Sequence, residues 1–340
     1  MNPMKKKTVY IIAELSANHN GDFDRAIQIV RAAASAGADA IKLQTYTADT
    51  ITLDVDSEIF RVGPGTPWEG KKLHDLYNAA FTPWEWQPKI KAEAQRLGMD
   101  CISTPFDTTA VDFLEKMDVP AYKIASFELV DIPLIKYTAA KGKPMIMSVG
   151  MATEEEIRDA LDAVRATGND DITLLKCVSA YPADPEDMNL ATIHDIKKRF
   201  AVEIGLSDHT LSHEVAIAAV ALGAVVVEKH ITISRSDGGF DASFSLEPDE
   251  FKKMVDSIRI VEKALGSPTY GTEKENPCRL FRKSLFVAEN IREGEKFTPE
   301  NIRSVRPGNG LPPKHYEEIL GKTAMRDMEK GAPLSWDAVK

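Results

Sequence analysis

The hydrophobic positions of the chain form short runs that alternate with helix-like stretches from residue 8 to about residue 266. The runs are rich in Val and Ile and do not alternate apolar with polar residues, which is typical of strands buried on both faces of a parallel sheet. Eight such runs are present: Val9–Leu15, Ala40–Thr45, Cys101–Thr104, Ala121–Ala125, Met145–Gly150, Ile172–Ser179, Val202–Ser207 and Val225–Ile231.

Helical patterns separate these runs. Within Asp22–Ala36 the apolar residues recur at helical spacing, and Gly37 follows as a stop signal. Thr153 and Glu156 have the spacing of a capping box at the start of a second helix, Thr153–Thr167. Two further helices are expected at Ser212–Ala221 and Pro248–Leu265.

Eight β-α units within about 260 residues match the length of a (β/α)8, or TIM, barrel. The alternative is an open, doubly wound α/β sheet. That fold often has a Gly-x-Gly-x-x-Gly turn after its first strand, and none follows Val9–Leu15. We therefore expect an α/β protein whose first domain, residues 1–266, is a TIM barrel.

The pattern changes after residue 266. Residues 267–280 are polar and include one Gly and two Pro, which is typical of a linker. Residues 281–340 contain a strand-like run at Ser284–Val287 among several Gly and Pro residues. We expect them to form a small second domain.

One segment of the barrel region does not fit the simple repeat. Residues 46–81 follow the second expected strand and are too long for a plain βα loop. They include Trp68 and a Gly63-Pro64-Gly65 turn. Two interpretations remain open: the segment is a wall or lid over a substrate, or it is a surface decoration.

Composition and charge exclude several classes of function. The net charge is −10, which disfavours nucleic acid as a partner because phosphates need a basic face. The longest apolar run, Val215–Val227, is too short to cross a bilayer, so we expect no membrane partner. Lys5–Lys7 are followed by a brief apolar stretch that meets Glu14, which is not a signal-peptide pattern. An odd number of widely spaced cysteines predicts reduced thiols in a cytoplasmic protein: Cys101, Cys177 and Cys278.

Polar residues collect where the expected strands end. Chemistry in a TIM barrel takes place at the C-terminal strand ends, and all eight ends have ionisable or hydroxyl groups. This predicts a polar active site that handles anions. The residues are Glu14; Lys42 and Gln44; Ser103 and Thr104; Lys123, Ser126 and Glu128; Ser148; Lys176, Ser179 and Tyr181; Ser207, Asp208 and His209; Glu228, Lys229 and His230.

Strand alternation places Lys42 and Gln44 on the same face, where both can point into the barrel. Lys123 and Lys176 also lie within apolar strands, and a buried lysine needs a counter-charge or a route to water. A single such lysine is well explained by a salt bridge to a glutamate. Two or three that converge favour a phosphate or carboxylate cradle, completed by hydroxyls. The candidate hydroxyls are those of Thr104, Ser126, Ser148 and Ser207.

His209 and His230 end the seventh and eighth expected strands, which are neighbours in a barrel. Two imidazoles at adjacent strand ends favour a shared divalent metal, whereas one alone favours a structural role. With mixed nitrogen and oxygen ligands, Mn, Mg or Co is expected. Asp208 and Asp241 are candidates to complete or orient the ligands, and His19 is a further candidate to face the site.

Six motifs occur in an order that resembles the sialic acid synthase family. They are residues 13–21 (AELSANHNG), 41–45 (IKLQT), 102–106 (ISTPF), 122–126 (YKIAS), 205–210 (GLSDHT) and 228–230 (EKH). Residues 305–310 (VRPGNG) resemble the small C-terminal antifreeze-like (SAF) domain of that family. The resemblance covers nearly the whole chain and implies a TIM barrel followed by a SAF domain.

Within the family the chain resembles most the branch that makes pseudaminic acid. The residues concerned are Leu15–Asn18, Lys42–Thr47 and the pair Lys176–Cys177. Ser179 stands where neuraminate synthases commonly have Asn, so the sugar contacts there should differ.

The resemblance implies a condensation of phosphoenolpyruvate with an open-chain amino-sugar aldehyde. In the pseudaminate branch the sugar is 2,4-diacetamido-2,4,6-trideoxy-L-altrose, and the products are a nine-carbon 2-keto acid and phosphate. Related alternatives are a neuraminate or legionaminate synthase. An alternative from a different class of enzyme is a metal-dependent pyruvate aldolase. A third alternative, suggested only by residues 281–340, is a non-catalytic carbohydrate- or ice-binding protein.

The resemblance also implies roles for individual residues. Glu128 is the expected base for the attacking water, Asp241 orients the metal-bound species, and Glu14 is a third catalytic carboxylate that also contacts the sugar. His209 and His230 bind the metal. Family members form dimers in which the SAF domain caps the partner's barrel, so the expected dimer is domain-swapped. Phosphoenolpyruvate binding falls to Lys42, Thr104, Lys123, Ser126, Ser148 and Ser207, and sugar binding to Gln44, Ser179, Tyr181 and Arg306.

Overall fold

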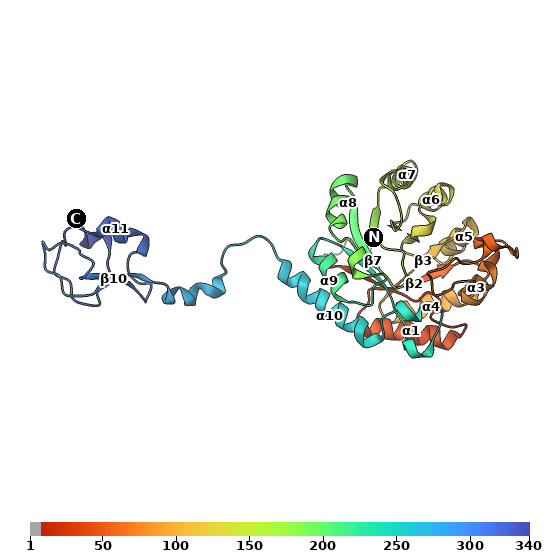
Figure 1. The fold of residues 1–340 in the computed structure, drawn as a ribbon, viewed down its shortest axis with the longest axis horizontal. Helices are drawn as coiled ribbons and strands as arrows, with labels where there is room; N and C mark the ends of the chain where they lie inside the picture. The colour runs from red at the N-terminus through yellow and green to blue at the C-terminus, as the bar shows by residue number, and fades with distance from the viewer. Residues whose placement is uncertain (1–7) are drawn as a thin grey trace. The chain divides into compact units, whose positions relative to one another are not determined.

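The first part of the chain is a closed parallel barrel, as expected. The structure, a computed structural model, describes residues 8–340, so Lys5–Lys7 lie outside the described residues. The open-sheet alternative is wrong, because β1 pairs with β8 and closes the ring of strands. Figure 1 shows helices arranged around these strands. The expected strands are confirmed, with ends shifted by at most two residues. They are β1 (Tyr10–Glu14), β2 (Ala40–Thr45), β3 (Asp100–Pro105), β4 (Tyr122–Ile124), β5 (Met145–Ser148), β6 (Ile172–Cys177), β7 (Glu203–Asp208) and β8 (Val226–His230).

Helices surround the barrel, and their ends follow from local capping. Asp22 caps α1 by accepting hydrogen bonds from the backbone N–H groups of Asp24 and Arg25, at 2.8 and 3.2 Å. Thr153 and Glu156 form the expected capping box of α7. The helices of the barrel part are α1 (Phe23–Ala36), α2 (Ala48–Ile51), α3 (Leu73–Ala80), α4 (Gln87–Arg96), α5 (Thr108–Lys116), α6 (Ile132–Ala139), α7 (Glu154–Arg165), α8 (Thr192–Phe200), α9 (Glu214–Ala221) and α10 (Pro248–Leu265).

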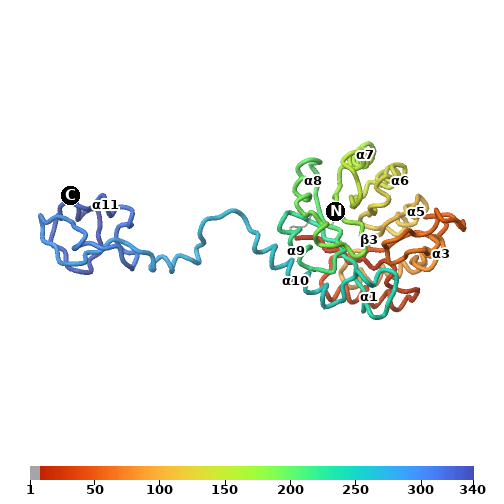
Figure 2. Tube along the Cα trace, in the orientation of Figure 1, coloured from red at the N-terminus to blue at the C-terminus, as the bar shows by residue number. Residues whose placement is uncertain are grey.

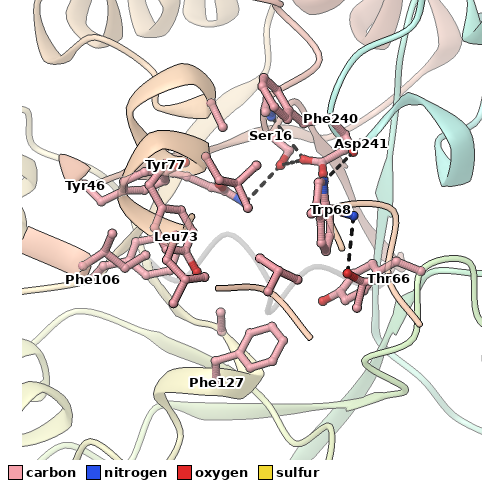
Figure 3. Close-up of a pocket in the computed structure, with 18 of the residues that line it drawn as sticks. Ser16, Tyr46, Thr66, Trp68, Leu73, Tyr77, Phe106, Phe127, Phe240 and Asp241 are labelled. Atoms are coloured by element: carbon pink, nitrogen blue, oxygen red, sulfur yellow. Dashed lines mark hydrogen bonds between the residues drawn. The ribbon is translucent and has the colours of Figure 1, made fainter. Parts of the chain in front are cut away.

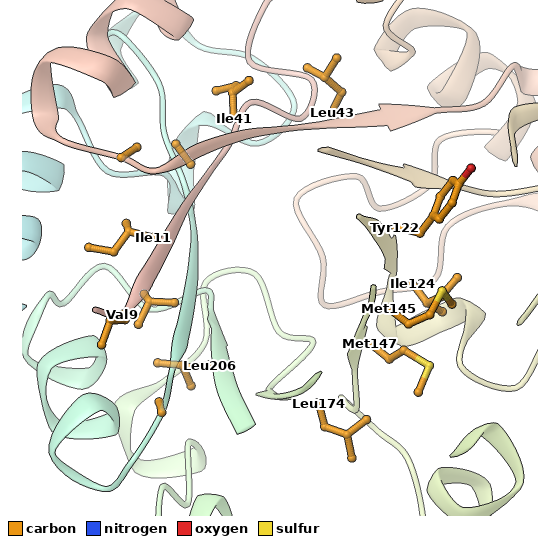
Figure 4. Packing of buried hydrophobic residues seen from close by; sticks show 14 of the residues in the cluster. Val9, Ile11, Ile41, Leu43, Tyr122, Ile124, Met145, Met147, Leu174 and Leu206 are labelled. Carbon is orange, nitrogen blue, oxygen red and sulfur yellow. The ribbon is translucent and has the colours of Figure 1, made fainter. Parts of the chain in front are cut away.

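Two apolar layers hold the barrel together. The larger one lies between strands and helices, where strand residues such as Ile41, Met147 and Leu206 point outward (Figure 4). The smaller one fills the barrel interior, and we call it the inner apolar layer. It consists of Tyr10, Ile12, Ala40, Ile102, Ala121, Ile146, Leu175 and Val226.

Gly205 of β7 completes the inner apolar layer by leaving room for its neighbours. A Cβ atom at this position would lie 2.6 Å from Leu175 Cδ2 and 2.5 Å from the carbonyl oxygen of Val226. Both distances are far below van der Waals contact. The interior is therefore filled from the adjacent strands β6 and β8, and β7 contributes only backbone at this level.

The segment 46–81, which we call the insertion, contains α2, a 3-10 helix (Glu58–Phe60) and α3. Its central part folds back on itself, since Val62 N–H donates to Lys71 O and Gly70 N–H donates to Val62 O, both at 2.9 Å. Trp68 fastens this loop to the barrel, because its indole N–H donates to Phe240 O at 2.9 Å. The insertion therefore has a defined position at the barrel mouth.

The chain separates into two compact units, one that ends at Gly266 and one that spans Ser267–Lys340. The second unit begins with a 3-10 helix, Glu273–Phe281, within and just beyond the segment expected to be a linker. Its only strands within the described residues are the antiparallel pair β9 (Ser284–Val287) and β10 (Ile302–Val305), and loops dominate the rest (Figure 2). A short helix, α11 (Tyr316–Ile319), lies beyond them, and the unit has its own apolar core.

Two of the three cysteines, Cys101 and Cys177, are buried, while Cys278 is exposed, and all three are free thiols. In residues 8–340 no helix has both the length and the apolar character needed to cross a membrane.

Candidate active site

A ring of polar side chains lies directly above the inner apolar layer. Residues i and i+2 of a strand share a face, so the residue two positions beyond each inner apolar residue also points into the barrel. At that level the apolar interior becomes polar, and we call this ring the inner polar layer. It consists of Glu14, Lys42, Thr104, Lys123, Ser148, Cys177, Ser207 and Glu228, all buried.

The two lysines of this layer converge on buried carboxylates. Lys42 Nζ lies 2.7 Å from Glu14 Oε2 and 3.6 Å from Glu228 Oε1. Lys123 Nζ lies 3.8 Å from Glu228 Oε2. The lysines converge, as expected for a phosphate or carboxylate site. They also form salt bridges to glutamates, the alternative explanation for a buried lysine, since Glu228 lies near both ammonium groups.

Hydroxyl groups complete this network. Lys42 donates to Thr104 Oγ1 at 3.3 Å, Lys123 donates to Ser148 Oγ at 2.7 Å, and Ser207 donates to Glu228 Oε1 at 3.3 Å. Five of the six residues expected to bind phosphoenolpyruvate therefore share one layer. Such a set of cations and hydroxyl donors suits an anion with several oxygens.

Burial and the two lysines together separate the pKa values of the two carboxyl groups of the inner polar layer, Glu14 and Glu228. Burial raises the pKa of Glu14 to about 7, with Lys42 opposing the shift and Glu228 adding to it. For Glu228 burial acts in the same direction, but Lys123 and Lys42 outweigh it, so the pKa is lowered. Glu14 is thus the group that exchanges a proton near neutral pH, while Glu228 stays charged.

Ser126 and Ser179 lie next to the backbone of Gly150, beside the inner polar layer. Gly150 N–H donates to Ser126 Oγ at 3.0 Å. A Cβ atom on Gly150 would overlap Ser179 Oγ and lie 2.8 Å from Ser126 Oγ, so only glycine leaves this recess open. Ser179 was expected to contact the sugar. It lies beside Ser126 and does not line the cavity described next.

A cavity of about 490 Å³ opens above the inner polar layer. Gln44, Glu128, Tyr181, His230 and Asp241, all expected site residues, line it. In Figure 3, Leu73, Tyr77 and Phe106 lie on one side, and Ser16, Trp68 and Asp241 lie opposite. The cavity thus combines a polar side with an apolar wall. The insertion forms much of the cavity wall, so it is not a decoration remote from the site. It contributes Tyr46, Ile51, Val62, Thr66, Trp68, Leu73, Leu76, Tyr77 and Ala80 to the lining.

Glu128 and Asp241 occupy different surroundings within the cavity. Burial raises the pKa of Glu128 to about 7, and its Oε2 is buried without a hydrogen-bond partner among residues 8–340. Asp241 Oδ2 accepts hydrogen bonds from Ser16 Oγ and from Ala17 N–H, and burial raises its pKa as well. Asp241 is therefore fixed in place, whereas Glu128 has an oxygen free to accept a proton.

The rings of His209 and His230 lie side by side, with centroids 5.4 Å apart. His209 Nδ1 is 2.8 Å from Val178 O, and a carbonyl only accepts, so Nδ1 carries a proton and Nε2 is the donor atom of the neutral ring. Burial lowers the pKa of His209, but the neighbouring Cys177 and the hydrogen bond to Val178 outweigh it, so the pKa is raised. Burial, and after it the nearby His209, lowers the pKa of His230 well below its usual value, which keeps this imidazole neutral. Neutral imidazole is the form that binds metals.

The donor set fits a metal held by two protein ligands. His230 Nδ1 is buried and has no hydrogen-bond partner in the part of the chain that the structure describes. Across residues 8–340, no group of three or more His, Cys, Asp and Glu side chains is arranged to hold a metal. Any further ligands to an ion on these two imidazoles would therefore be substrate or water oxygens.

Three other candidates lie away from this pair. Asp208 does not orient the metal ligands as expected, because it is out of phase with Ser207 on β7 and points away from the barrel interior. Its Oδ2 lies 2.6 Å from Lys229 Nζ, and its Oδ1 accepts a hydrogen bond from Thr210 N–H. His19 bonds Gly21 N–H and Thr82 Oγ1 through its two ring nitrogens, so it joins two loops. Lys176 bonds the carbonyl of Cys177 and does not join the ion pairs of the inner polar layer.

The expected roles omitted Glu228, although it is the residue that connects both lysines. Its position was available from alternation, since Glu228 is in phase with His230 and with the inner residue Val226. Cys177, whose Sγ is 3.9 Å from His209 Nδ1, and Phe244 were also missed. For Phe244 no strand pattern helps, because it lies in a loop 3-10 helix, Ala242–Phe244.

Arg306 lies in the second unit, directly after β10, and its side chain is exposed. The peptide bond to Pro307 is cis, and Ser284 Oγ donates to Pro307 O at 2.7 Å. The segment around Arg306 is therefore held by the core strand β9.

Comparison with known proteins identifies the family. The NeuB family model matches residues 29–270, and the SAF domain model matches residues 282–340. The chain is 47% identical to a pseudaminic acid synthase of Campylobacter jejuni, over 96% of each chain, and 42% identical to one of Helicobacter pylori, over 97% of each. It is also similar to the crystal structure of an N-acetylneuraminic acid synthetase from Leptospira borgpetersenii, with a TM-score of 0.70 and 32% identity, over 79% of this chain and 90% of that one. The chain, with its inner polar layer, its paired histidines and its small second unit, belongs to the NeuB family.

Proposed function

We propose that this enzyme is a transferase that joins phosphoenolpyruvate to 2,4-diacetamido-2,4,6-trideoxy-L-altrose, giving pseudaminic acid and phosphate. Relatives that are 42–47% identical over nearly the whole chain are named pseudaminic acid synthases, which supports this reaction. One structural observation supports it most: two buried lysines converge, on either side of Glu228, beneath a cavity with an apolar wall.

Phosphoenolpyruvate would occupy the inner polar layer. Lys42 and Lys123 neutralise its phosphate and carboxylate, and the hydroxyls of Thr104, Ser148 and Ser207 donate hydrogen bonds, with Ser126 at the recess beside Gly150. Without substrate, Glu14 and Glu228 hold the lysines. Because the pKa of Glu14 is about 7, a proton on Glu14 frees Lys42 to bind the anion.

The sugar would lie in the cavity above. Gln44 and Tyr181 offer polar contacts, while Val62, Leu73 and Tyr77 of the insertion form an apolar surface. A 6-deoxy sugar with two acetamido groups presents three methyl groups, which such a surface accommodates without stranding a hydroxyl. A 6-hydroxyl in the same place would lose hydrogen bonds to water.

The chemistry joins two carbon atoms and cleaves one carbon–oxygen bond. The C3 atom of phosphoenolpyruvate bonds to the aldehyde carbon C1, and the aldehyde oxygen takes up a proton to become a hydroxyl. Water adds to C2 and gives its proton to Glu128, whose free Oε2 and pKa near 7 suit a base. The bond from C2 to the phosphate oxygen then breaks while the new C2 hydroxyl gives up its proton to become the keto group, and phosphate leaves with that proton. Asp241, fixed by Ser16, orients the aldehyde end.

We further propose that a divalent metal, Mn, Mg or Co, binds His209 and His230. The neutral His230 ring and the position of His209, whose Nδ1 is bonded to Val178 O so that Nε2 is the donor atom of its neutral form, support this assignment. An ion bound there supplies Lewis-acid polarisation of the aldehyde carbonyl.

The assembly we propose is a homodimer in which the SAF domain of one chain caps the barrel of the other and brings Arg306 to the sugar. The resemblance to the family supports this arrangement. Three free thiols, two of them buried, support a cytoplasmic location, where cysteines stay reduced.

A two-sugar assay of phosphate release, with and without metal, tests the reaction. We expect phosphate only with phosphoenolpyruvate, metal and sugar together, and a kcat/KM for the 6-deoxy sugar at least about 10-fold above that for N-acetylmannosamine. Replacement of His209 by Ala should abolish turnover. Full activity after exhaustive metal removal would contradict the metal, and preference for N-acetylmannosamine would indicate a neuraminate synthase. The sugar substrate of legionaminate synthases is assayed in parallel as a third substrate. Consumption of pyruvate without phosphate release would indicate an aldolase.

A further inference from the structure

We infer that Trp68 of the insertion is a positioning residue: it holds the paired histidines and Asp241 in their working geometry through the residues packed between them. This inference rests on the proposed function, because it takes His209, His230 and Asp241 as the groups that act on the aldehyde. One layer of side chains separates Trp68 from the two histidines, and one peptide unit separates its hydrogen-bond partner, Phe240 O, from Asp241.

Aromatic rings connect Trp68 to both histidines. The Trp68 ring lies 5.5 Å from Tyr181 and 6.2 Å from Phe244, centroid to centroid. Tyr181 in turn lies 4.5 Å from His209, and Phe244 lies 5.0 Å from His230. Tyr181 and Phe244 also contact each other at 5.0 Å, so the four rings and Trp68 form one packed cluster.

This packing matters because hydrogen bonds leave one of the imidazoles unfixed. His209 is oriented by the carbonyl of Val178, but His230 Nδ1 has no such partner among the described residues. The orientation of His230 therefore depends on its neighbours, chiefly the edge of Phe244, which meets it at an interplanar angle of 71°. Anything that lets Phe244 move also lets His230 rotate.

A hydrogen bond connects Trp68 to Asp241 along the backbone. The indole N–H donates to Phe240 O at 2.9 Å, and Phe240 directly precedes Asp241. Lys71 of the insertion lies over the Phe240 ring, 4.9 Å from its centroid. On the other side, Ser245 Oγ donates to Asp241 O at 2.6 Å. The loop with Asp241 is thus held between the insertion and its own 3-10 turn.

The chain offers a matched control in Trp84, which lies just beyond the insertion. Its indole N–H donates to Tyr46 O at 3.0 Å, and its ring packs on Phe113 at 4.8 Å. Trp84 therefore has the same kind of hydrogen bond and a similar ring contact, but within residues 8–340 its ring does not pack against Tyr181, Phe244, His209 or His230.

The experiment compares Trp68→Leu, Trp68→Phe, Trp84→Leu and Trp84→Phe with the wild type. Steady-state kinetics give kcat and both KM values, and electron paramagnetic resonance of free Mn²⁺ gives metal affinity without substrate. We expect Trp68→Leu to lower kcat and Mn²⁺ affinity, each by about 10-fold or more, as is usual when supports of metal ligands are removed. The KM for phosphoenolpyruvate should not change. Trp68→Phe, which keeps a ring, should recover part of the loss, and each Trp84 variant should stay close to wild type.

Two outcomes would overturn the inference. In one, Trp68→Leu raises only the KM for the sugar, so Trp68 is merely part of the wall. In the other, each Trp84 variant loses as much as its Trp68 counterpart, so the effect is general destabilisation. If the wild type neither binds nor needs Mn²⁺, the proposed metal fails, but the kcat ratio of Trp68→Leu to Trp84→Leu still decides the positioning role.

Discussion

Glu128 has two properties that a single substitution separates. It is the proposed base, and it is also a carboxyl group whose pKa burial raises to about 7. A raised pKa means that the folded protein keeps the proton more tightly than the unfolded chain does. Between pH 4.5 and pH 7 the unfolded carboxylate ionises while the folded one does not, so stability falls as pH rises through that window.

Glu128→Gln should therefore lose activity and gain stability. The loss of turnover should be about 100-fold or more, since a general base is removed, and the residual activity should no longer rise with pH up to about 7. The variant should gain stability over the wild type as the pH rises. The difference between their free energies of unfolding should be larger at pH 8 than at pH 5, by up to about 3 kcal/mol. Urea denaturation at the two pH values measures this difference. Retained activity with an unchanged pH profile would place the base elsewhere.

At the scale of single residues, strand alternation predicted most of the anion site. Lys42, Thr104 and Lys123 were expected to converge, and they do: Lys42 donates to Thr104, and Glu228 lies between Lys42 and Lys123. Asp208 was a wrong candidate because alternation was not applied to it: it follows the inward-facing Ser207 and therefore points out of the barrel. Residues in loops, such as Phe244, depend on tertiary packing and have no periodic signal.

At the scale of elements, β7 depends on the absence of one side chain. Gly205→Ala would place a methyl group against Leu175 and the backbone of Val226, and a backbone atom cannot rotate away. We expect a loss of about 1–3 kcal/mol in the free energy of unfolding, as for other overpacked cores. Thermal or urea unfolding measures it. Gly63→Ala is the control, because no atom lies within 4 Å of its added Cβ. Equal stability of the two variants would refute tight packing of the inner apolar layer.

The insertion should set the choice of sugar. Leu73→Ser replaces part of the apolar wall with a hydroxyl, so the KM for the 6-deoxy sugar should rise by about 10-fold while the KM for phosphoenolpyruvate stays constant. Discrimination against N-acetylmannosamine should weaken. Leu53→Ser is the matched control, since Leu53 is in the same insertion but is 62% exposed and does not line the cavity. An effect of Leu53→Ser as large as that of Leu73→Ser would mean that the wall does not act by contact.

The elements themselves were largely predictable, because buried parallel strands leave apolar runs and capping residues mark helix ends. The strand of Ala40–Thr45 and the helix of Pro248–Leu265 have the predicted bounds. The conformation of the insertion was not predictable, since its key contact, from Trp68 to Phe240, spans 172 residues and follows no periodicity.

At the scale of the whole molecule, a mixing experiment tests the proposed domain exchange. His209→Ala disables one barrel, and Arg306→Ala disables one SAF domain. Each variant alone should be nearly inactive. If the domains are exchanged, co-refolded mixtures should recover about a quarter of wild-type activity, because half of randomly formed dimers are mixed and each has one intact site. If each SAF domain serves its own barrel, the mixed dimers have no intact site and activity stays absent.

The uneven burial of the three thiols has a practical consequence. Cys101 and Cys177 are enclosed by the barrel, whereas Cys278 is exposed on the 3-10 helix near the start of the second unit. A maleimide dye should therefore attach at a single place without any engineering. A dye on Cys278 thus labels the second unit, and its response to each substrate would report in real time whether catalysis changes the surroundings of that unit.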